Sequence, residues 1–427
     1  MRIDRRDSMA PSISSLGQHF TRAGTGLEAA LDGFLASRPE PPRLLGFGEP
    51  MHGAEAFPLL RNQVLRHLVS EHGYRSVAIE SDCLAGLAVD DYVTGERDDL
   101  DEVLATGFSH GFGDLPSNRE LLIWLREHNE DRAPHDQVRF YGFDAPMEMS
   151  GASSPRLPLS ALYEHLTAHL SPSRIPHDMH TIDVLLGEDA AWTHPDAMLD
   201  PARCTGHSPE ARELRVITDD LVGLLESETP GLQQVASPGE HGRARLFART
   251  AQGLLRYHAV MADSALSASE RMSRMLAVRD AMMAANLRAI AATECGPTLV
   301  FAHNQHLRRD PSTLRLGDMD LRWWSGGAGA AARIGSGYAV IASYLGTVGE
   351  SGITAPAPET AEGVLAKSTP DRALFPAAPL SEAFSHHSLE ARAGIPPETG
   401  YFPLAAADLD GIDAIAFITD ASEPRTT

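Results

Sequence analysis

The stretch LLGFGEPMHGAEAFPLLRN, residues 44–62, joins an apolar run of strand length to a carboxylate, a histidine and the start of a helical pattern. The run RLLGFG (43–48) is short, apolar and followed by turn formers, as is typical of a buried strand. Apolar residues then recur at close to helical spacing across residues 54–74, with Gly73 as the expected helix stop. A strand followed directly by a helix indicates a βαβ unit and therefore a parallel sheet.

Three further runs of strand length repeat this pattern: SVAIE (76–80), VRFYGF (138–143) and TLVFA (298–302). Two later runs are candidates for additional strands, YAVIASY (338–344) and AIAFI (414–418). Between about 155 and 295 the strand runs disappear and helical periodicity dominates. We predict an α/β fold with a mainly parallel central sheet flanked by helices and a large all-helical insertion.

This change of pattern predicts how the chain is divided. Residues 1–154, which include an N-terminal helix, form the first part of the α/β core, and residues 155–295 form the helical insertion lobe. Residues 296–427 complete the core, because the strand pattern resumes at Thr298. Two segments rich in glycine, alanine and proline, 325–337 and 352–380, are predicted to be loops.

Composition excludes several classes of function. The chain of 427 residues carries 58 acidic and 36 basic residues, a formal charge of −22 that repels nucleic acids and anionic membranes. It contains a single lysine, Lys367, so a lysine Schiff base or a phosphate-binding loop with its lysine is not expected.

Signals for export are missing as well. The N-terminus has no apolar signal core, no run of 18 apolar residues occurs, and three widely spaced cysteines suggest no disulfide framework. We therefore expect a cytoplasmic protein that acts on a small molecule. No feature of the sequence indicates an oligomeric state.

Polar side chains follow four of the predicted strands, at the point where each strand ends. Ligands of open parallel sheets bind outside the carboxyl ends of the strands, so we expect these side chains to share one cleft. Singly, each is equally typical of a helix cap, a turn or a hydrogen-bonded histidine, but their coincidence at four strand ends favours a functional site. The residues are Glu49, His52, Glu80, Asp82, Asp144, His303 and His306.

Two motifs match known signatures without their structural context. GFSHG (107–111) has the G-x-S-x-G spacing of a nucleophile elbow, which requires a strand before the serine and a helix directly after it. Here the preceding residues are helical in pattern and turn formers follow, so a loop near the cleft is favoured over a nucleophilic Ser109. GFGEPM begins like a dinucleotide-binding loop but has Met51 in place of the third glycine.

As a set, six blocks of sequence resemble those of the erythromycin esterase-like family in the same order. They are GEPMHGAEAF with LRN, SVAIESDCLAGLAVDDYVTG, LLIWLREHN, RFYGFDAP, VRDAMMAANL and LVFAHNQH. The resemblance covers about residues 40–150 and 270–310. It implies an α/β core with a helical lobe and, in the members that confer antibiotic resistance, hydrolysis of a macrolide lactone.

The resemblance also implies roles for individual residues. His52 is similar to the family's general base that activates water, and Glu49 and Glu80 to the carboxylates that orient the histidine or the water. Arg61 matches the family's arginine, which could bind a carboxylate or stabilise an oxyanion. His303 and His306 resemble the paired histidines, of which we assign His303 to catalysis.

Substrate contacts are predicted around this centre. His306, Asp144, Asp82, His110 and Phe112 are assigned to them, although the segment 107–118 has fewer aromatic residues than many family members. That difference argues against erythromycin itself as the substrate. Arg279 and Asp280 resemble a recurring family pair, which we expect to stabilise its helix or anchor the lobe.

The leading hypothesis is therefore a carboxylic ester or lactone hydrolase acting on a bulky natural product, without a cofactor. Alternatives are a biosynthetic enzyme of secondary metabolism that uses the same site for transacylation, elimination or cyclisation, and a protein that only sequesters a small molecule. A metal-dependent hydrolase is the remaining alternative, because distant relatives use metal and the site's carboxylates and histidines could hold a divalent ion. It is not favoured, because the resistance enzymes are regarded as metal-free.

Overall fold

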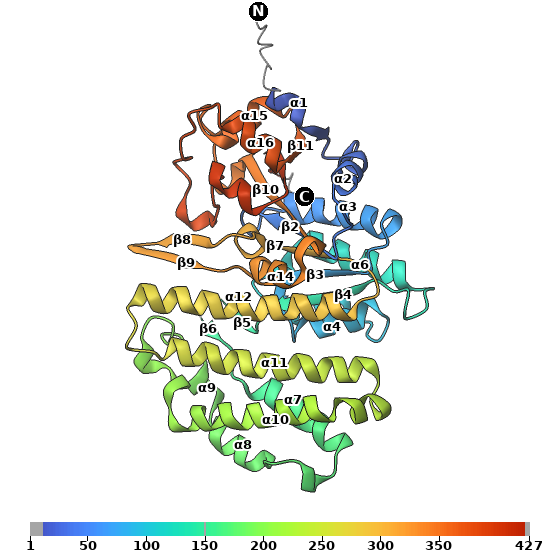
Figure 1. Cartoon of the computed structure of the whole chain (residues 1–427), viewed down its shortest axis with the longest axis vertical. Coiled ribbons are helices and arrows are strands. Elements are labelled where there is room, and N and C mark those ends of the chain that lie inside the picture. The colour runs from blue at the N-terminus through green and yellow to red at the C-terminus, as the bar shows by residue number, and fades with distance from the viewer. Residues whose placement is uncertain (1–11, 149–150, 423–427) are drawn as a thin grey trace, which may run out of the picture.

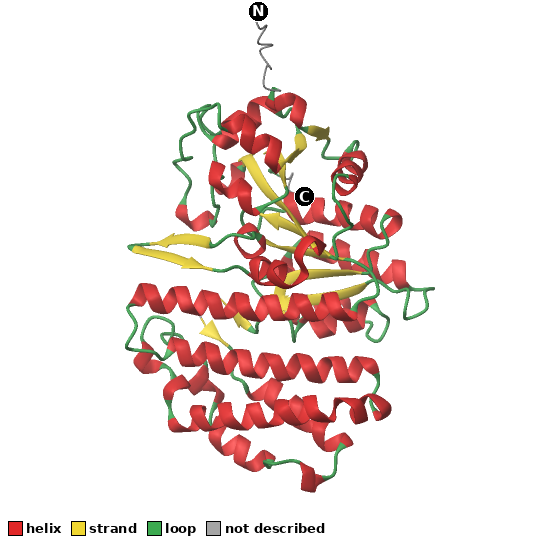
Figure 2. Ribbon diagram, viewed as in Figure 1, coloured by secondary structure: helices red, strands yellow, loops and turns green. Residues whose placement is uncertain are grey.

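A computed structural model of the chain describes residues 12–148 and 151–422. Residues 1–11, at the N-terminus, lie outside the described ranges. Its centre is an eight-stranded sheet in the order β1-β11-β12-β10-β2-β7-β3-β4, in which all neighbours from β12 to β4 are parallel. Helices cover the sheet, and the predicted α/β class is confirmed (Figures 1 and 2). The strands are β1 (Gln18–Phe20), β2 (Leu44–Glu49), β3 (Ser76–Asp82), β4 (Arg139–Asp144), β7 (Thr298–His303), β10 (Tyr338–Thr347), β11 (Arg372–Pro376) and β12 (Ala414–Asp420).

The central strands are apolar because helices bury both of their faces. Every residue of β2 and of β7 is buried, which explains their nearly continuous hydrophobic runs. The helices of the core are α1 (Ile13–Leu16), α2 (Leu27–Ala36), α3 (Ala56–Glu71), α4 (Gly86–Val93), α5 (Leu100–Thr106), α6 (Pro116–Asn129), α13 (Asn304–Leu307), α14 (Gly326–Ile334), α15 (Ala361–Ser368) and α16 (Ala377–Phe384).

Gly48 of β2 lets a side chain cross the sheet from one of its neighbours to the other. The Asn304 side chain, just after β7, donates to the backbone oxygen of Ser343 in β10 and accepts from its N–H, at 2.7 and 3.1 Å. A Cβ atom at Gly48 would lie 2.1 Å from the Asn304 Oδ1 atom. Any larger residue at position 48 would therefore break this tie between β7 and β10.

The helices of the insertion stack below the sheet as a separate layer (Figure 1). They have an apolar core of their own, to which Leu162, Ile182, Leu221 and Leu255 contribute. The last of them, α12, packs against both α11 and α14, so it borders the lobe and the core at once. The helices are α7 (Arg156–His169), α8 (Met179–Leu186), α9 (Asp189–Trp192), α10 (Pro209–Val235), α11 (Pro238–Met261) and α12 (Ala268–Thr293).

The two segments predicted to be loops contain regular structure, so that prediction was wrong. Helix α14 begins at a Ser325 cap whose hydroxyl accepts the Ala328 N–H. Its glycines permit close packing rather than flexibility, because a Cβ atom at Gly327 would lie 2.0 Å from the Leu307 backbone oxygen. The segment 352–380 contains α15, β11 and the start of α16.

Two short antiparallel strand pairs lie outside the main sheet. Strands β5 (Met147–Glu148) and β6 (Gly151–Ala152) pair next to the insertion, and β8 (Ser312–Leu316) pairs with β9 (Met319–Trp323). Across residues 12–148 and 151–422, no helix is both long and apolar enough to cross a membrane.

Candidate active site

The structure places the carboxyl ends of β2, β7, β3 and β4 side by side at one edge of the sheet. Glu49 is the register partner of His303, and Asp82 is the partner of Asp144. The four strand ends therefore bring together side chains from positions 49 to 306, as the parallel arrangement requires.

The pair of Glu49 and His52 lies at the centre of this edge. The His52 Nδ1 atom is 2.7 Å from the Glu49 Oε1 atom, and its Nε2 atom is 4.0 Å from the Glu80 Oε1 atom. The His52 side chain is 44% exposed, whereas those of Glu49 and Glu80 are 4% and 2% exposed. The half-exposed imidazole is thus held at Nδ1 by a buried carboxylate, and its Nε2 atom lies on the side of Glu80.

These carboxylates change the proton affinity of His52. Burial by itself lowers the pKa of His52, but the hydrogen bond to Glu49 and the charges of Glu80 and Glu49 outweigh it and raise the pKa to about 9. Burial raises the pKa of the Glu49 carboxyl, whereas the His52 hydrogen bond and the charge of Arg61 act in the opposite direction.

Glu80 is held as a carboxylate by two cationic side chains and one backbone donor. Its Oε1 atom lies 3.0 Å from the Arg279 Nη2 atom and 3.2 Å from the His306 Nε2 atom, and its Oε2 atom accepts the His303 N–H at 2.8 Å. Burial acts to raise the pKa of Glu80, but the charges of His306, His52 and Arg279 outweigh it and bring the pKa well below its ordinary value.

Asp144, fully buried at the end of β4, shares the Arg279 guanidinium with Glu80. Arg279 donates to the Asp144 Oδ2 atom at 2.6 Å, and this contact together with His110 lowers the Asp144 pKa against the effect of burial. The His110 ring lies between Asp144 and Glu148, at 3.3 and 3.2 Å. His110 has a φ of 59°, a conformation that costs a residue with a side chain about 1–3 kcal/mol.

The paired histidines have different surroundings. His303 donates from Nε2 to the Pro50 oxygen at 3.0 Å and accepts the Gln305 N–H at Nδ1, and burial lowers its pKa to about 3. The His306 ring instead bridges Asp280 and Glu80, whose charges raise its pKa although burial lowers it. His303 is therefore a neutral ring with both nitrogens bonded, which suits a positioning role better than proton transfer.

Arg61 is fully buried behind the site. Its Nη2 atom donates to the Asn62 and Asn118 side-chain oxygens at 2.7 and 2.9 Å, and its guanidinium lies 4.9 Å from the centre of the Phe301 ring. The sequence left two roles open for this arginine. Its burial favours electrostatic support of Glu49 over direct contact with a substrate.

The remaining predicted residues line or support the site. Phe112 is buried with its ring centre 5.3 Å from that of His52, so it forms an apolar wall beside the imidazole. Asp82 accepts the Leu84 N–H at 2.7 Å and thereby closes a turn. The Ser109 hydroxyl accepts the Asp82 N–H at 2.9 Å and lies 3.3 Å from the Ser81 hydroxyl. Neither contact is to a histidine, as a serine nucleophile would need.

Arg279 and Asp280 tie α12, the last helix of the lobe, to the core, which agrees with the expected lobe-anchoring role, and their partners also place them at the site. Arg279 connects Glu80 with Asp144, and Asp280 accepts from His306 and from the Trp323 indole at 2.9 Å each. Helical periodicity did not reveal this pair, because charged residues on a long helix are usually part of its solvent-exposed face. The block VRDAMMAANL was the one signal that pointed to it.

Similar solved structures support the fold. A protein from Bacillus cereus is 16% identical, with a TM-score of 0.72 over 97% of both chains. A succinoglycan biosynthesis protein is 14% identical, with a TM-score of 0.68 over 99% of both chains. An erythromycin esterase carrying a histidine-to-asparagine mutation, in its open conformation, is 19% identical, with a TM-score of 0.62 over 90% of this chain and 92% of that one.

Sequence comparison identifies the family. The erythromycin esterase type II of Escherichia coli is 29% identical over 104 residues, about a quarter of its length (24%) and 24% of this chain. The family model described as erythromycin esterase matches residues 69–420, which begin after Glu49, His52 and Arg61. Because that match covers most of the sequence, the chain belongs to the erythromycin esterase family.

Proposed function

We propose that the protein hydrolyses a carboxylic ester or lactone of a bulky natural product by direct attack of water, with His52 as general base. One observation carries the proposal: the Nε2 atom of the half-exposed His52 ring lies 4.0 Å from the Glu80 Oε1 atom. That gap is too long for a hydrogen bond but allows one water molecule to bond to both atoms. Both the nucleophile and its base would then be in place.

In the proposed reaction, neutral His52 takes a proton from this water at Nε2 while the water oxygen bonds to the carbonyl carbon. Glu49 holds the Nδ1 proton, fixes the ring orientation and stabilises the imidazolium that forms. When the carbon–oxygen bond of the tetrahedral intermediate breaks, the Nε2 proton passes to the leaving alkoxide. The products are a carboxylic acid and an alcohol.

Positive charge at the site is supplied by side chains. Arg279 and His306 give the Glu80 Oε1 atom two cationic partners at 3.0 and 3.2 Å, so a divalent metal at this oxygen would have to compete with both. Water activation by the imidazole is therefore preferred to a metal-dependent route. Arg279 is also placed to polarise a substrate carbonyl, since its side chain is 15% exposed.

The chemistry is tested by incubating the protein with a panel of macrolides and simpler lactones and following product masses, before and after dialysis against a chelator. Hydrolysis adds the mass of one water, and chelation leaves the rate unchanged. Binding without a change in mass would show sequestration instead. A rate that falls on chelation and returns with added metal would support the metal-dependent alternative.

A biosynthetic reaction on the same site is the second candidate. One solved protein of similar fold is a succinoglycan biosynthesis protein, and a His–Glu pair that activates water can equally activate an acceptor hydroxyl for transacylation. A product that gains an acceptor group, loses water or cyclises without gaining water would identify this reaction in the same mass measurement.

The raised pKa of His52 predicts a strongly pH-dependent rate. Only neutral imidazole can accept a proton from water, and with a pKa of about 9 most of the free enzyme carries protonated His52 at neutral pH. We expect kcat/KM to rise about tenfold per pH unit from pH 6 and to level off near pH 9. The measurement is a pH–rate profile corrected for alkaline hydrolysis of the substrate. A plateau that begins near pH 6.5 would contradict this assignment.

A further inference from the structure

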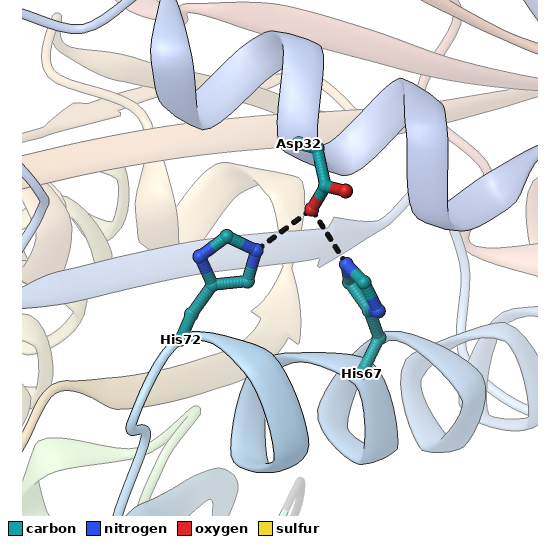
Figure 3. A group of neighbouring side chains, drawn as sticks. All are labelled: Asp32, His67 and His72. Atoms are coloured by element: carbon teal, nitrogen blue, oxygen red, sulfur yellow. Dashed lines mark hydrogen bonds and ion pairs between the residues drawn. The ribbon is translucent and has the colours of Figure 1, made fainter.

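A second group of metal-ligand side chains lies outside the active site. Asp32 of α2 points toward His67 on α3 and His72 directly after it (Figure 3). The active-site residues follow the carboxyl ends of the strands, whereas α3 begins near that edge and leads back to the start of β3. Sixteen residues of helix span about 24 Å, so His72 lies near the opposite edge of the sheet.

The three side chains converge closely. The Asp32 Oδ1 atom is 2.7 Å from the His67 Nε2 atom and 2.8 Å from the His72 Nε2 atom. The two ring centres are 5.3 Å apart. We searched residues 12–148 and 151–422 for groups of three or more histidine, cysteine or acidic residues whose ligand atoms all lie within 4.8 Å of one another. Within these residues, Asp32, His67 and His72 form such a group.

The local fold explains why the group is held in place. His72 caps α3, where its N–H donates to the Leu68 oxygen, and Gly73 then turns the chain with a φ of +68°. That conformation suits glycine and sends the chain away from the helix axis, leaving the His72 ring free to face α2. His67 lies buried at the helix interface, whereas the Asp32 side chain is 53% exposed.

We propose that Asp32, His67 and His72 form a zinc site that clamps α2 to α3. Two imidazole nitrogens and one carboxylate oxygen are ligands that Zn²⁺ prefers, and the exposed side of Asp32 leaves a fourth position for water. Mg²⁺ and Ca²⁺ prefer all-oxygen sites and bind poorly here. The net charge of −22 adds a general attraction for cations.

Metal binding replaces the two N–H···O hydrogen bonds of the metal-free group. Each neutral imidazole then carries its proton on Nδ1 and offers the Nε2 lone pair to the ion, and Asp32 offers Oδ1 or Oδ2. Because only the folded chain brings the three ligands together, bound zinc stabilises the folded state.

The test is isothermal titration of the metal-free full-length chain with Zn²⁺ near neutral pH, together with thermal melting. We expect the wild-type chain to bind one equivalent of zinc and the His72→Ala and Asp32→Asn variants to bind none. Zinc should raise the melting temperature of the wild-type chain by several degrees and leave that of the two variants unchanged. Asp32→Asn keeps the size and an acceptor oxygen, so its loss of zinc would not reflect misfolding. Mg²⁺ and Ca²⁺ should give neither heat nor shift.

The chain offers a matched control in His177, which lies 2.8 Å from Asp220 and, within the described part of the chain, belongs to no group of three metal-ligand side chains. That pair is 24% and 49% exposed, against 28% and 53% for His72 and Asp32. His177→Ala should keep the full zinc stoichiometry. His169→Ala tests a different histidine group, in which the His165 ring lies 4.9 Å from that of His169 and 6.2 Å from that of His241.

Two outcomes would overturn the proposal. A wild-type chain that takes up no zinc would show that the group is only a hydrogen-bonded clasp between helices. Zinc that disappears with His169→Ala but remains with His72→Ala and Asp32→Asn would place the ion in the helical lobe. Neither result bears on ester hydrolysis, which depends on a separate group of residues.

Discussion

Replacing His52 with alanine is expected to lower kcat by on the order of 10²–10⁴ while the protein remains folded. His52 is 44% exposed and its direct hydrogen bond is to Glu49, so its removal costs activity rather than packing. His52→Gln sharpens the test, because glutamine can still donate to Glu49 but cannot accept a proton from water. Both variants should be equally slow in single-turnover assays, and their circular dichroism should match the wild type.

Ser109→Ala is the matched control for this prediction. Its hydroxyl is buried and bonded to the Asp82 N–H, so the substitution should cost stability, about 1–3 kcal/mol for the unsatisfied donor, but little turnover. A Ser109→Ala enzyme as slow as His52→Ala, or a His52→Ala enzyme at the wild-type rate, would refute direct attack of water activated by His52.

The largest loss of stability is expected from Arg279→Met. This guanidinium lies between two buried carboxylates, Glu80 and Asp144, and removal of one partner from such a group costs about 3–5 kcal/mol. Urea denaturation at pH 7 measures the difference in the free energy of unfolding. Arg315→Met, which removes an exposed ion pair with Asp320, should cost less than about 1 kcal/mol.

The loss should also depend on pH in a defined direction. In the wild type the pKa values of Glu80 and Asp144 lie below their ordinary values of 4.5 and 3.8, so their contribution to stability is present above those values and lost as the pH falls. Without Arg279 both carboxyl groups of the folded protein bind protons more readily. Lowering the pH should therefore reduce the free energy of unfolding of the variant by less than that of the wild type. The difference in the free energy of unfolding between the wild type and Arg279→Met should therefore become smaller from pH 7 to pH 4. A constant difference would mean that Arg279 acts through packing alone.

The core of the fold could be predicted because its strands are buried on both faces. Such strands are apolar throughout, and the runs at 43–48, 76–80 and 298–302 became the neighbouring strands β2, β3 and β7. The run at 138–143 became β4, which lies at the edge of the sheet beside β3. Their parallel order follows from the helices between them, and it brings Glu49 and His52 near Glu80 without any knowledge of contacts.

The parts that were missed depend on contacts between distant segments. The glycines of helix α14 led to the prediction of a flexible loop. In the structure they allow close approach to Leu307 and to α12, which sequence spacing does not reveal. Strand β11 is short, ends at a proline and pairs antiparallel with both of its neighbours, β1 and β12. The position of Arg279 depends on how α12 lies over the strand ends, so helical periodicity alone could not assign it to the site.

The order of the strands also constrains how the protein is made. On the ribosome, β2 and β3 emerge early, yet the strand that fits between them, β7, is synthesised only after the whole helical lobe. Until then the edges of β2 and β3 that β7 will cover remain unpaired in the nascent chain, a state prone to aggregation. We therefore expect fragments that stop within the lobe to be insoluble or bound by chaperones. We also expect this family to tolerate changes in the length of the lobe more readily than truncation of the chain before β7.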